Sequence, residues 1–235
     1  MKVDMQRNLK QGNFFFLLGG LCLLLLTAPA LSGLMGPYWA LELEIPASSL
    51  LIVGVWSLSG SRRFLYLGIA LVAFCVLSIV LFFVFHWAAA RWLTLLSVLI
   101  FLVLSSVMAL RLVLRPGPVD ANKIVGAVCV YLMIGVFLAV LYYLLQSVVP
   151  GSFNGLESYS EPQWFWRLLY FSFVTLSTLG YGDITPANAY SESMAYFEAI
   201  VGQFYIAIVV AGLVGSYMSG QGSPKAEIPA ESGDR

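Results

Sequence analysis

Six apolar segments, each long enough to cross a lipid bilayer, constrain this chain more than any other feature. They cover residues 14–34, 37–58, 64–85, 92–114, 124–145 and 194–217, and an apolar helix needs about 20 residues to cross the hydrocarbon core. In the whole chain 60% of the residues are hydrophobic and 10% are charged, so one soluble core could not bury this much apolar surface. The sequence therefore predicts an all-α membrane protein with six transmembrane helices.

The distribution of basic residues predicts the orientation of these segments. With the N-terminus in the cytoplasm, all of the 12 lysines and arginines except Arg91 and Arg167 fall on the cytoplasmic side, as the positive-inside rule requires. Both termini of this multi-pass protein are therefore expected inside. A second hypothesis is a cleaved signal peptide, because the basic start, the apolar run and Ala28-Pro29-Ala30 resemble one. Cleavage would leave the later segments oriented as before.

Proline and glycine divide the chain into two halves. The sequence Arg115-Pro116-Gly117-Pro118 ends the fourth segment, since proline cannot continue a helix. We expect a cytoplasmic N-terminus over residues 1–13, a four-helix front half over 14–115, a back half over 119–217 and a disordered cytoplasmic tail over 218–235, which is short and polar. The net charge of zero gives no indication of a nucleic-acid partner.

The back half contains a further apolar segment, residues 163–177, that is too short to cross the membrane. Ser160 followed by Gln163 is typical of a capping box at a helix N-terminus. A helix from there to Ser177 would be about 20 Å long and would enter from the outer side. Its C-terminal end would point its partial negative charge at the centre of the membrane, where it would stabilise a cation.

The segment that follows, Thr178-Leu179-Gly180-Tyr181-Gly182, must return to the outer surface. Non-helical backbone at this depth persists only where it lines a polar space. Gly180 and Gly182 can adopt positive φ, which lets successive carbonyl groups turn to one side, and Thr178 can add its hydroxyl oxygen. One loop supplies one side of a cation cage, so several copies must surround an axis. Cyclic symmetry with about four subunits meets that requirement.

Residues 178–182 resemble the signature sequence of the potassium channel family. The resemblance extends over the capped helix, Asp183 and both flanking segments, about residues 122 to 217. It implies a pore domain over 119–217 with an outer helix, a re-entrant pore helix, a selectivity-filter loop and an inner helix, assembled as a homotetramer. A voltage-sensor helix has arginines at every third position, whereas the fourth segment has Arg111 and Arg115 near its inner end. We therefore expect passive, potassium-selective conduction with little or no voltage dependence.

The resemblance also implies roles for single residues of the filter. The carbonyl groups of Thr178, Leu179, Gly180 and Tyr181, with the Thr178 hydroxyl, would bind dehydrated K+, the permeant ion, and no other cofactor is expected. Asp183 would raise the cation concentration at the outer mouth, and Tyr181 would brace the filter against Tyr170 and Phe171. Family members often carry valine in place of Leu179 and two tryptophans in place of Tyr170 and Phe171. We expect selectivity to survive the change at Leu179, which contributes a carbonyl, and filter stability and slow inactivation to differ because Phe171 cannot donate a hydrogen bond.

The last segment carries the candidate gating residues. Gly202 has the spacing of the family's inner-helix hinge, and a helix-packing glycine is the equal alternative. If Gly202 sets the register of the inner helix, four residues at helical spacing form a stripe that lines the inner pore. They are Gln203, Ile206, Val210 and Val214. Glu198 lies inside the membrane, where an ionisable group needs a partner. A hydrogen-bonded strut behind the filter is favoured over a proton-sensitive gate.

Four other classes of function were weighed against a potassium channel. The intact glycines argue against a non-selective cation channel, and a potassium transporter would resemble four degenerate filter repeats in one long chain. No metal cluster, phosphate loop or nucleophile–base pair supports a membrane enzyme. A regulatory subunit of a hetero-oligomeric channel remains open, because the sequence does not fix the composition of the assembly. We expect a prokaryotic plasma-membrane channel that contacts lipid and has no soluble ligand domain.

Overall fold

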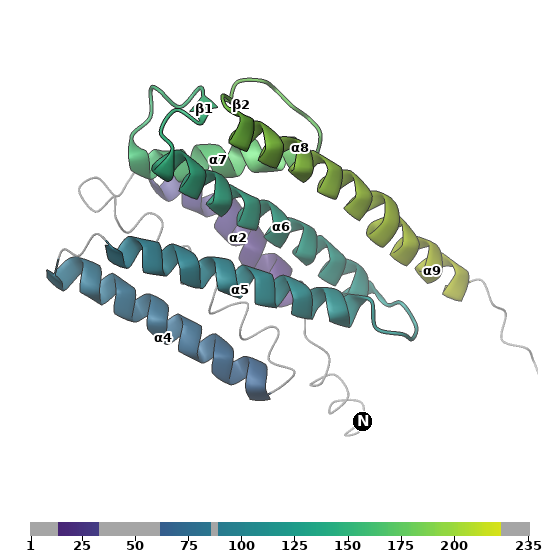
Figure 1. The fold of residues 1–235 in the computed structure, drawn as a ribbon. Helices are drawn as coiled ribbons and strands as arrows, with labels where there is room; N and C mark the ends of the chain where they lie inside the picture. Colours follow the sequence, from purple (N-terminus) through teal and green to yellow (C-terminus); the bar gives the residue numbers. More distant parts are fainter. Residues whose placement is uncertain (1–13, 33–61, 86–88, 222–235) are drawn as a thin grey trace, which may run out of the picture.

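The computed structural model describes residues 14–32, 62–85 and 89–221, and all of its long elements are helices (Figure 1). The predicted segment over 37–58 and both chain ends, 1–13 and 222–235, lie outside the described residues. The helices are α2 (Phe14–Ser32), α4 (Arg62–Phe85), α5 (Ala89–Val113), α6 (Ala121–Val148), α7 (Glu161–Leu176), α8 (Ala189–Phe204), the π-helical η2 (Tyr205–Val210) and α9 (Ala211–Gln221).

Three stretches of the described chain are helical, long and apolar enough to cross a membrane. They are Trp92–Val113, Ala121–Val148 and Ala189–Ser219, and they confirm the fourth, fifth and sixth predicted segments as candidate spans. Helices α2 and α4 coincide with the first and third predicted segments, and their described apolar parts, Phe14–Leu26 and Tyr66–Ser78, are shorter. The chain is therefore a helical, multi-pass membrane protein.

Helix α6 is the centre of the bundle. Helices α2, α5 and α7 pack against it, and α4 packs on α5 (Figure 1). Two glycines on α6 permit close contact with its neighbours, because a Cβ at Gly126 would lie 2.8 Å from the Phe14 ring and one at Gly135 would lie 2.6 Å from the Phe173 ring. Small residues at helix contacts are the usual means of close packing in membranes.

Helix α7 begins and ends where its sequence predicts. The Ser160 backbone N–H donates to Gln163 Oε1 at 3.0 Å, which satisfies one of the free donors at the helix start. Sixteen residues take α7 from Glu161 to Leu176, too few to cross a bilayer. The chain then turns back through residues 177–183 to the same end of the bundle.

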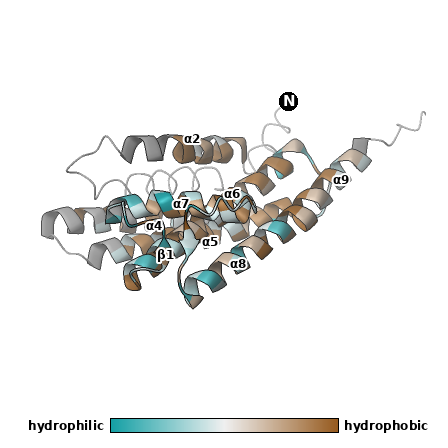
Figure 2. Ribbon diagram, turned by 90° about the horizontal axis from the view of Figure 1, so that it is seen from above, coloured by the Kyte–Doolittle hydropathy of each residue, from teal (hydrophilic) through white to brown (hydrophobic). Residues whose placement is uncertain are grey.

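The inner helix is longer than the sequence predicts and is not uniform. It begins at Ala189, because Asn188 accepts from the N–H groups of Tyr190 and Ser191, and it continues to Gln221. The prediction from apolar character alone missed its polar first turn. At the C-terminal end of η2 the Ala211 N–H donates to the carbonyl of Ile206, five residues earlier. From there α9 extends away from the other helices (Figures 1 and 2).

Candidate ion-binding site

The filter loop is held by hydrogen bonds to the C-terminal turn of α7. The contacts are Thr178 N to Thr175 O at 2.9 Å, Leu179 N to Val174 O at 2.9 Å and Gly180 N to Val174 O at 3.3 Å. In a trans peptide the N–H and C=O groups point in opposite directions, and no described peptide bond is cis. Because the donors face α7, the carbonyl oxygens of residues 177–179 point away from it, to one common side.

The φ angles of the loop alternate in sign. Thr178, Gly180 and Gly182 have φ of 61°, 58° and 79°, whereas Leu179 and Tyr181 are not in the positive region. Thr178 is the only described non-glycine residue with positive φ. Glycine adopts this conformation without steric cost and threonine does not. The sequence prediction anticipated positive φ at the two glycines and missed it at Thr178. Thr178 lies two residues before Gly180, just as Gly180 lies two residues before Gly182.

Tyr170 joins the pore helix to the outer end of the loop. Its ring stacks on that of Tyr181, with centroids 6.4 Å apart and planes 7° apart, and its hydroxyl donates to Asp183 Oδ1 at 3.2 Å. Desolvation and this hydrogen bond raise the pKa of the Tyr170 hydroxyl, which therefore stays a donor.

Phe171, the other aromatic residue assigned to filter support, faces a different part of the molecule. Its ring packs edge-on against Tyr142 at 5.2 Å and against Phe153 at 5.4 Å between centroids. Within this chain it supports the back of the pore helix, and the brace on Tyr181 comes from Tyr170.

A clamp at the outer mouth was not predicted from the sequence. Strand β1 (Phe153–Asn154) pairs antiparallel with β2 (Thr185–Pro186), so the loop before α7 is tied to the chain after the filter. Gly155, with φ of 86°, lies against the carbonyl of Asp183, and a Cβ there would be 2.2 Å from the Asp183 oxygen. Such a short strand has no clear hydrophobic pattern, but the positive-φ glycine beside it is the signal that could have found the turn.

Glu198 is fully buried behind the pore helix. Its Oε1 lies 2.5 Å from Ser172 Oγ on α7, and its Oε2 accepts from the hydroxyl of Tyr142 on α6. Ser172 Oγ also lies 2.8 Å from the carbonyl oxygen of Gly135. Three helices of the back half therefore meet at one carboxyl group, and the sequence prediction had identified only Glu198 among these residues.

One turn further along the inner helix, Gly202 is packed against the end of α7. A Cβ at this position would lie 2.3 Å from the carbonyl oxygen of Leu176, and that oxygen also accepts from the Tyr131 hydroxyl at 3.1 Å. The neighbouring Gln203 donates from Nε2 to Thr178 Oγ1 at 3.2 Å. The inner helix therefore touches the inner end of the filter loop directly.

The predicted pore-lining stripe does not keep one register. Gln203, Ile206 and Val214 are exposed in the single chain and Val210 is half-buried, but η2 separates the first of them from the last. A π turn holds more residues than an α turn, so α9 is rotated relative to a continuous helix. The four residues therefore do not form the straight stripe that an uninterrupted helix would give.

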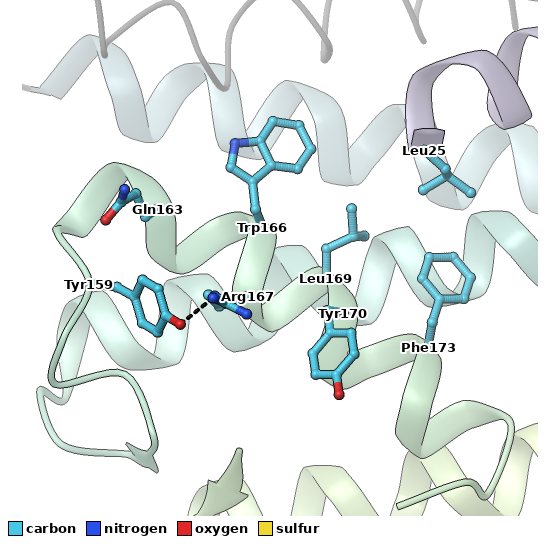
Figure 3. Close-up of a pocket in the computed structure, with 8 residues that line it drawn as sticks. All are labelled: Leu25, Tyr159, Gln163, Trp166, Arg167, Leu169, Tyr170 and Phe173. Carbon is cyan, nitrogen blue, oxygen red and sulfur yellow. Dashed lines mark hydrogen bonds between the residues drawn. The ribbon is translucent and has the colours of Figure 1, made fainter. Parts of the chain in front are cut away.

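A cavity of about 490 Å³ lies on α7, and Figure 3 shows the side chains around it. Arg167 is hydrogen-bonded to the Tyr159 hydroxyl and its guanidinium lies 4.0 Å from the centre of the Tyr159 ring. The residues of the filter loop do not line this cavity. The lining residues are Leu25, Tyr159, Gln163, Trp166, Arg167, Leu169, Tyr170 and Phe173.

Comparison with known proteins locates the same part of the chain. Residues 124–219 match the family described as Ion channel. Two pore potassium channel c of Oryza sativa subsp. japonica is 35% identical over 83 residues, which is 33% of this chain and 18% of that protein. Two-pore potassium channel 2 of Arabidopsis thaliana is 32% identical over 93 residues, or 40% of this chain and 18% of that protein. No solved structure matches.

The helices indicate a membrane protein, and residues 124–219 of the chain match the family described as Ion channel. Part of the chain is also similar to two plant potassium channels. The family match begins within α6 and ends within α9, so it includes the filter loop and both flanking helices. The matched part covers less than a fifth of either plant relative. Neither relative is prokaryotic, so an origin in a prokaryotic plasma membrane stays a prediction.

Proposed function

We propose that this protein forms a homotetrameric channel that conducts K+ passively and selectively. The observation that carries the proposal is the geometry of residues 178–182, in which the N–H groups of the first three residues bond back to α7 and φ alternates in sign along the loop. Carbonyl oxygens turned to one side replace the hydration shell of a potassium ion. Thr178, Leu179, Gly180 and Tyr181 supply these carbonyls, and the Thr178 hydroxyl adds an oxygen at the inner end.

The outer mouth and the support of the filter follow from the same geometry. Asp183 is exposed, and its carboxylate attracts cations toward the entrance. Its hydrogen bond with Tyr170 fixes the carboxylate beside the filter. The proposed supports are Tyr170 at the outer end, Phe171 behind the pore helix and Glu198 between the three helices.

Assembly is needed because one chain leaves the filter open. Leu179 is 56% and Tyr181 66% exposed, and only 22% of the most apolar part of the inner helix is buried. Four copies around an axis would cover these surfaces and complete each ion cage. The basic residues of the fourth segment, Arg111 and Arg115, are exposed at its inner end and cross little of the membrane field, so weak voltage dependence is part of the proposal.

The deciding experiment measures K+ and Na+ flux in liposomes that contain the purified protein, with barium as a blocker. We expect K+ flux to exceed Na+ flux, and barium to block it. Gly180→Ala should abolish selective flux, because alanine at φ of 58° is strained by about 1–2 kcal/mol and the carbonyl turns away.

Gly151→Ala is the matched control for that variant. Gly151 also has positive φ, 82°, and nothing lies within 4 Å of an added Cβ, but it is not a residue of the filter loop. This variant should retain selective flux. Equal K+ and Na+ flux would instead indicate a non-selective cation channel, and absence of flux from the homomeric protein would favour a regulatory subunit.

A further inference from the structure

The group formed by Glu198, Ser172, Tyr142 and the Gly135 carbonyl has a defined hydrogen count. It contains three contacts, namely Ser172 with the Gly135 carbonyl, Ser172 with Glu198, and Tyr142 with Glu198. Each contact needs one hydrogen atom. The two hydroxyl groups supply one each, and the Gly135 oxygen can only accept.

The third hydrogen must come from the carboxyl group. With an ionised Glu198, the single Ser172 hydrogen is shared between the carbonyl and the carboxylate, so one contact brings two acceptors together. With a protonated Glu198, its O–H donates to Ser172 Oγ, Ser172 donates to the Gly135 carbonyl, and Tyr142 donates to the remaining carboxyl oxygen. All three contacts are then satisfied, and buried polar groups are normally paired in this way.

The surroundings of the carboxyl group favour the same form. Glu198 is fully buried, and burying an ionised carboxylate without a cation is strongly unfavourable. The titratable groups that face it are Tyr142 and, further away, Tyr131. Among the described residues no lysine, arginine or histidine forms an ion pair with it. The hydrogen count and the absence of a compensating charge in the described part both favour a protonated Glu198.

We propose that Glu198 is held protonated and acts as a positioning residue that fastens the inner helix to the pore helix and the outer helix. Ser172 and Leu176 are one turn apart on α7, and their partners Glu198 and Gly202 are one turn apart on α8. The two helices therefore run side by side in a fixed register behind the filter. The neutral acid joins three helices through one set of hydrogen bonds, and it does so without a buried charge.

This proposal deepens the function proposed above, and infrared spectroscopy of the purified protein tests it independently of ion flux. The spectrum of the unmodified protein minus that of Glu198→Gln should show the C=O stretch of a protonated carboxyl group at neutral pH. Glu192→Gln is the matched control, because Glu192 is exposed on the first turn of the same helix. Its difference spectrum should show carboxylate bands. Carboxylate bands from Glu198 would overturn the proposal.

The unfolding temperature of the conservative variant Glu198→Gln is the second readout. Glutamine can donate to Ser172 and accept from Tyr142 as the neutral acid does, so Glu198→Gln should unfold within about 2 °C of the parent. Glu198→Ala leaves both hydroxyl groups without this partner and should unfold about 5 °C lower or more. If glutamine destabilised the protein as much as alanine, the proposal that a protonated Glu198 joins the three helices would be rejected. Absence of K+ flux in the parent protein would contradict the channel and leave both readouts of Glu198 in place.

Discussion

At the scale of single residues, the site depends on backbone positions whose φ angle favours glycine. Gly155 and Gly180 both have positive φ, 86° and 58°, but they differ in their surroundings. Gly180 faces open space in the single chain, so its importance is conformational. Gly155 touches the Asp183 carbonyl, so there both conformation and contact exclude a larger residue. The first can be inferred from a motif, whereas the second becomes visible only in three dimensions.

Gly155→Ala is expected to disturb the outer mouth. The added methyl group would meet the Asp183 carbonyl oxygen at 2.2 Å, so the chain after the filter must move. We expect a loss of stability of about 2 kcal/mol or more and a several-fold fall in K+ flux, measured in liposomes. Gly151→Ala shares the positive φ without the contact and should lose only the conformational part, about 1 kcal/mol. Equal effects of the two variants would refute the clamp.

At the scale of the elements, the position of the pore helix follows from its ends. Gln163 caps its start, and its last carbonyls accept from the filter loop and from Tyr131. The C-terminal end of the pore helix also packs closely against the inner helix, where a Cβ at Gly202 would lie 2.3 Å from the Leu176 carbonyl oxygen. That contact supports a packing role for this glycine. The π-helical segment Tyr205–Val210 follows three residues later. There the Tyr205 hydroxyl donates to the Ala127 carbonyl at 2.7 Å.

Gly202→Ala separates the packing role from the hinge role. If packing dominates, the methyl group displaces the inner helix from Leu176 and destabilises the assembled protein by about 2 kcal/mol or more. Gly212→Ala is the control, since this glycine is also helical and nothing lies within 4 Å of an added Cβ; it should be neutral or stabilising by up to about 1 kcal/mol. Thermal unfolding measures both. A Gly202→Ala variant that keeps its full stability but opens less often would favour the hinge.

At the scale of the whole molecule, the inner helix is one of the described helices that carry large exposed apolar side chains. The inner helix has large exposed side chains at Tyr196, Phe197, Phe204 and Ile208, and the filter loop lies exposed beside it. A transmembrane surface can face lipid, but a filter loop cannot. In the proposed tetramer, burial of this surface against other copies of the chain would satisfy both elements together.

The prediction at the scale of the whole molecule concerns the number of copies in the assembled protein. The detergent-purified protein should behave as four copies of a 25.8 kDa chain. Phe204→Ala should shift the population toward smaller species, because truncating an interface aromatic costs about 1 kcal/mol or more. Phe15→Ala on α2 is the comparison, with 55% exposure against 62% for Phe204. Sizing by light scattering distinguishes them, and a monomeric parent protein would contradict the tetramer.

The amino-acid sequence by itself determined the class of fold and the place of the site. Apolar length predicted the candidate spans in α5, α6 and the inner helix, the capping box predicted the start of α7, and the two glycines two residues apart predicted positive φ in the loop after it. These features are local, because hydrophobic length, caps and glycine conformations act over a few neighbouring residues.

Only the tertiary structure decided which distant groups meet. It placed Glu198 between Ser172 and Tyr142, Gly155 on Asp183, and Phe171 away from Tyr181. It also introduced the π turn that shifts the register between Gln203 and Val214. These outcomes depend on how whole helices pack and on which buried polar groups find partners. No local pattern carries that information, since each partner lies tens of residues away along the chain.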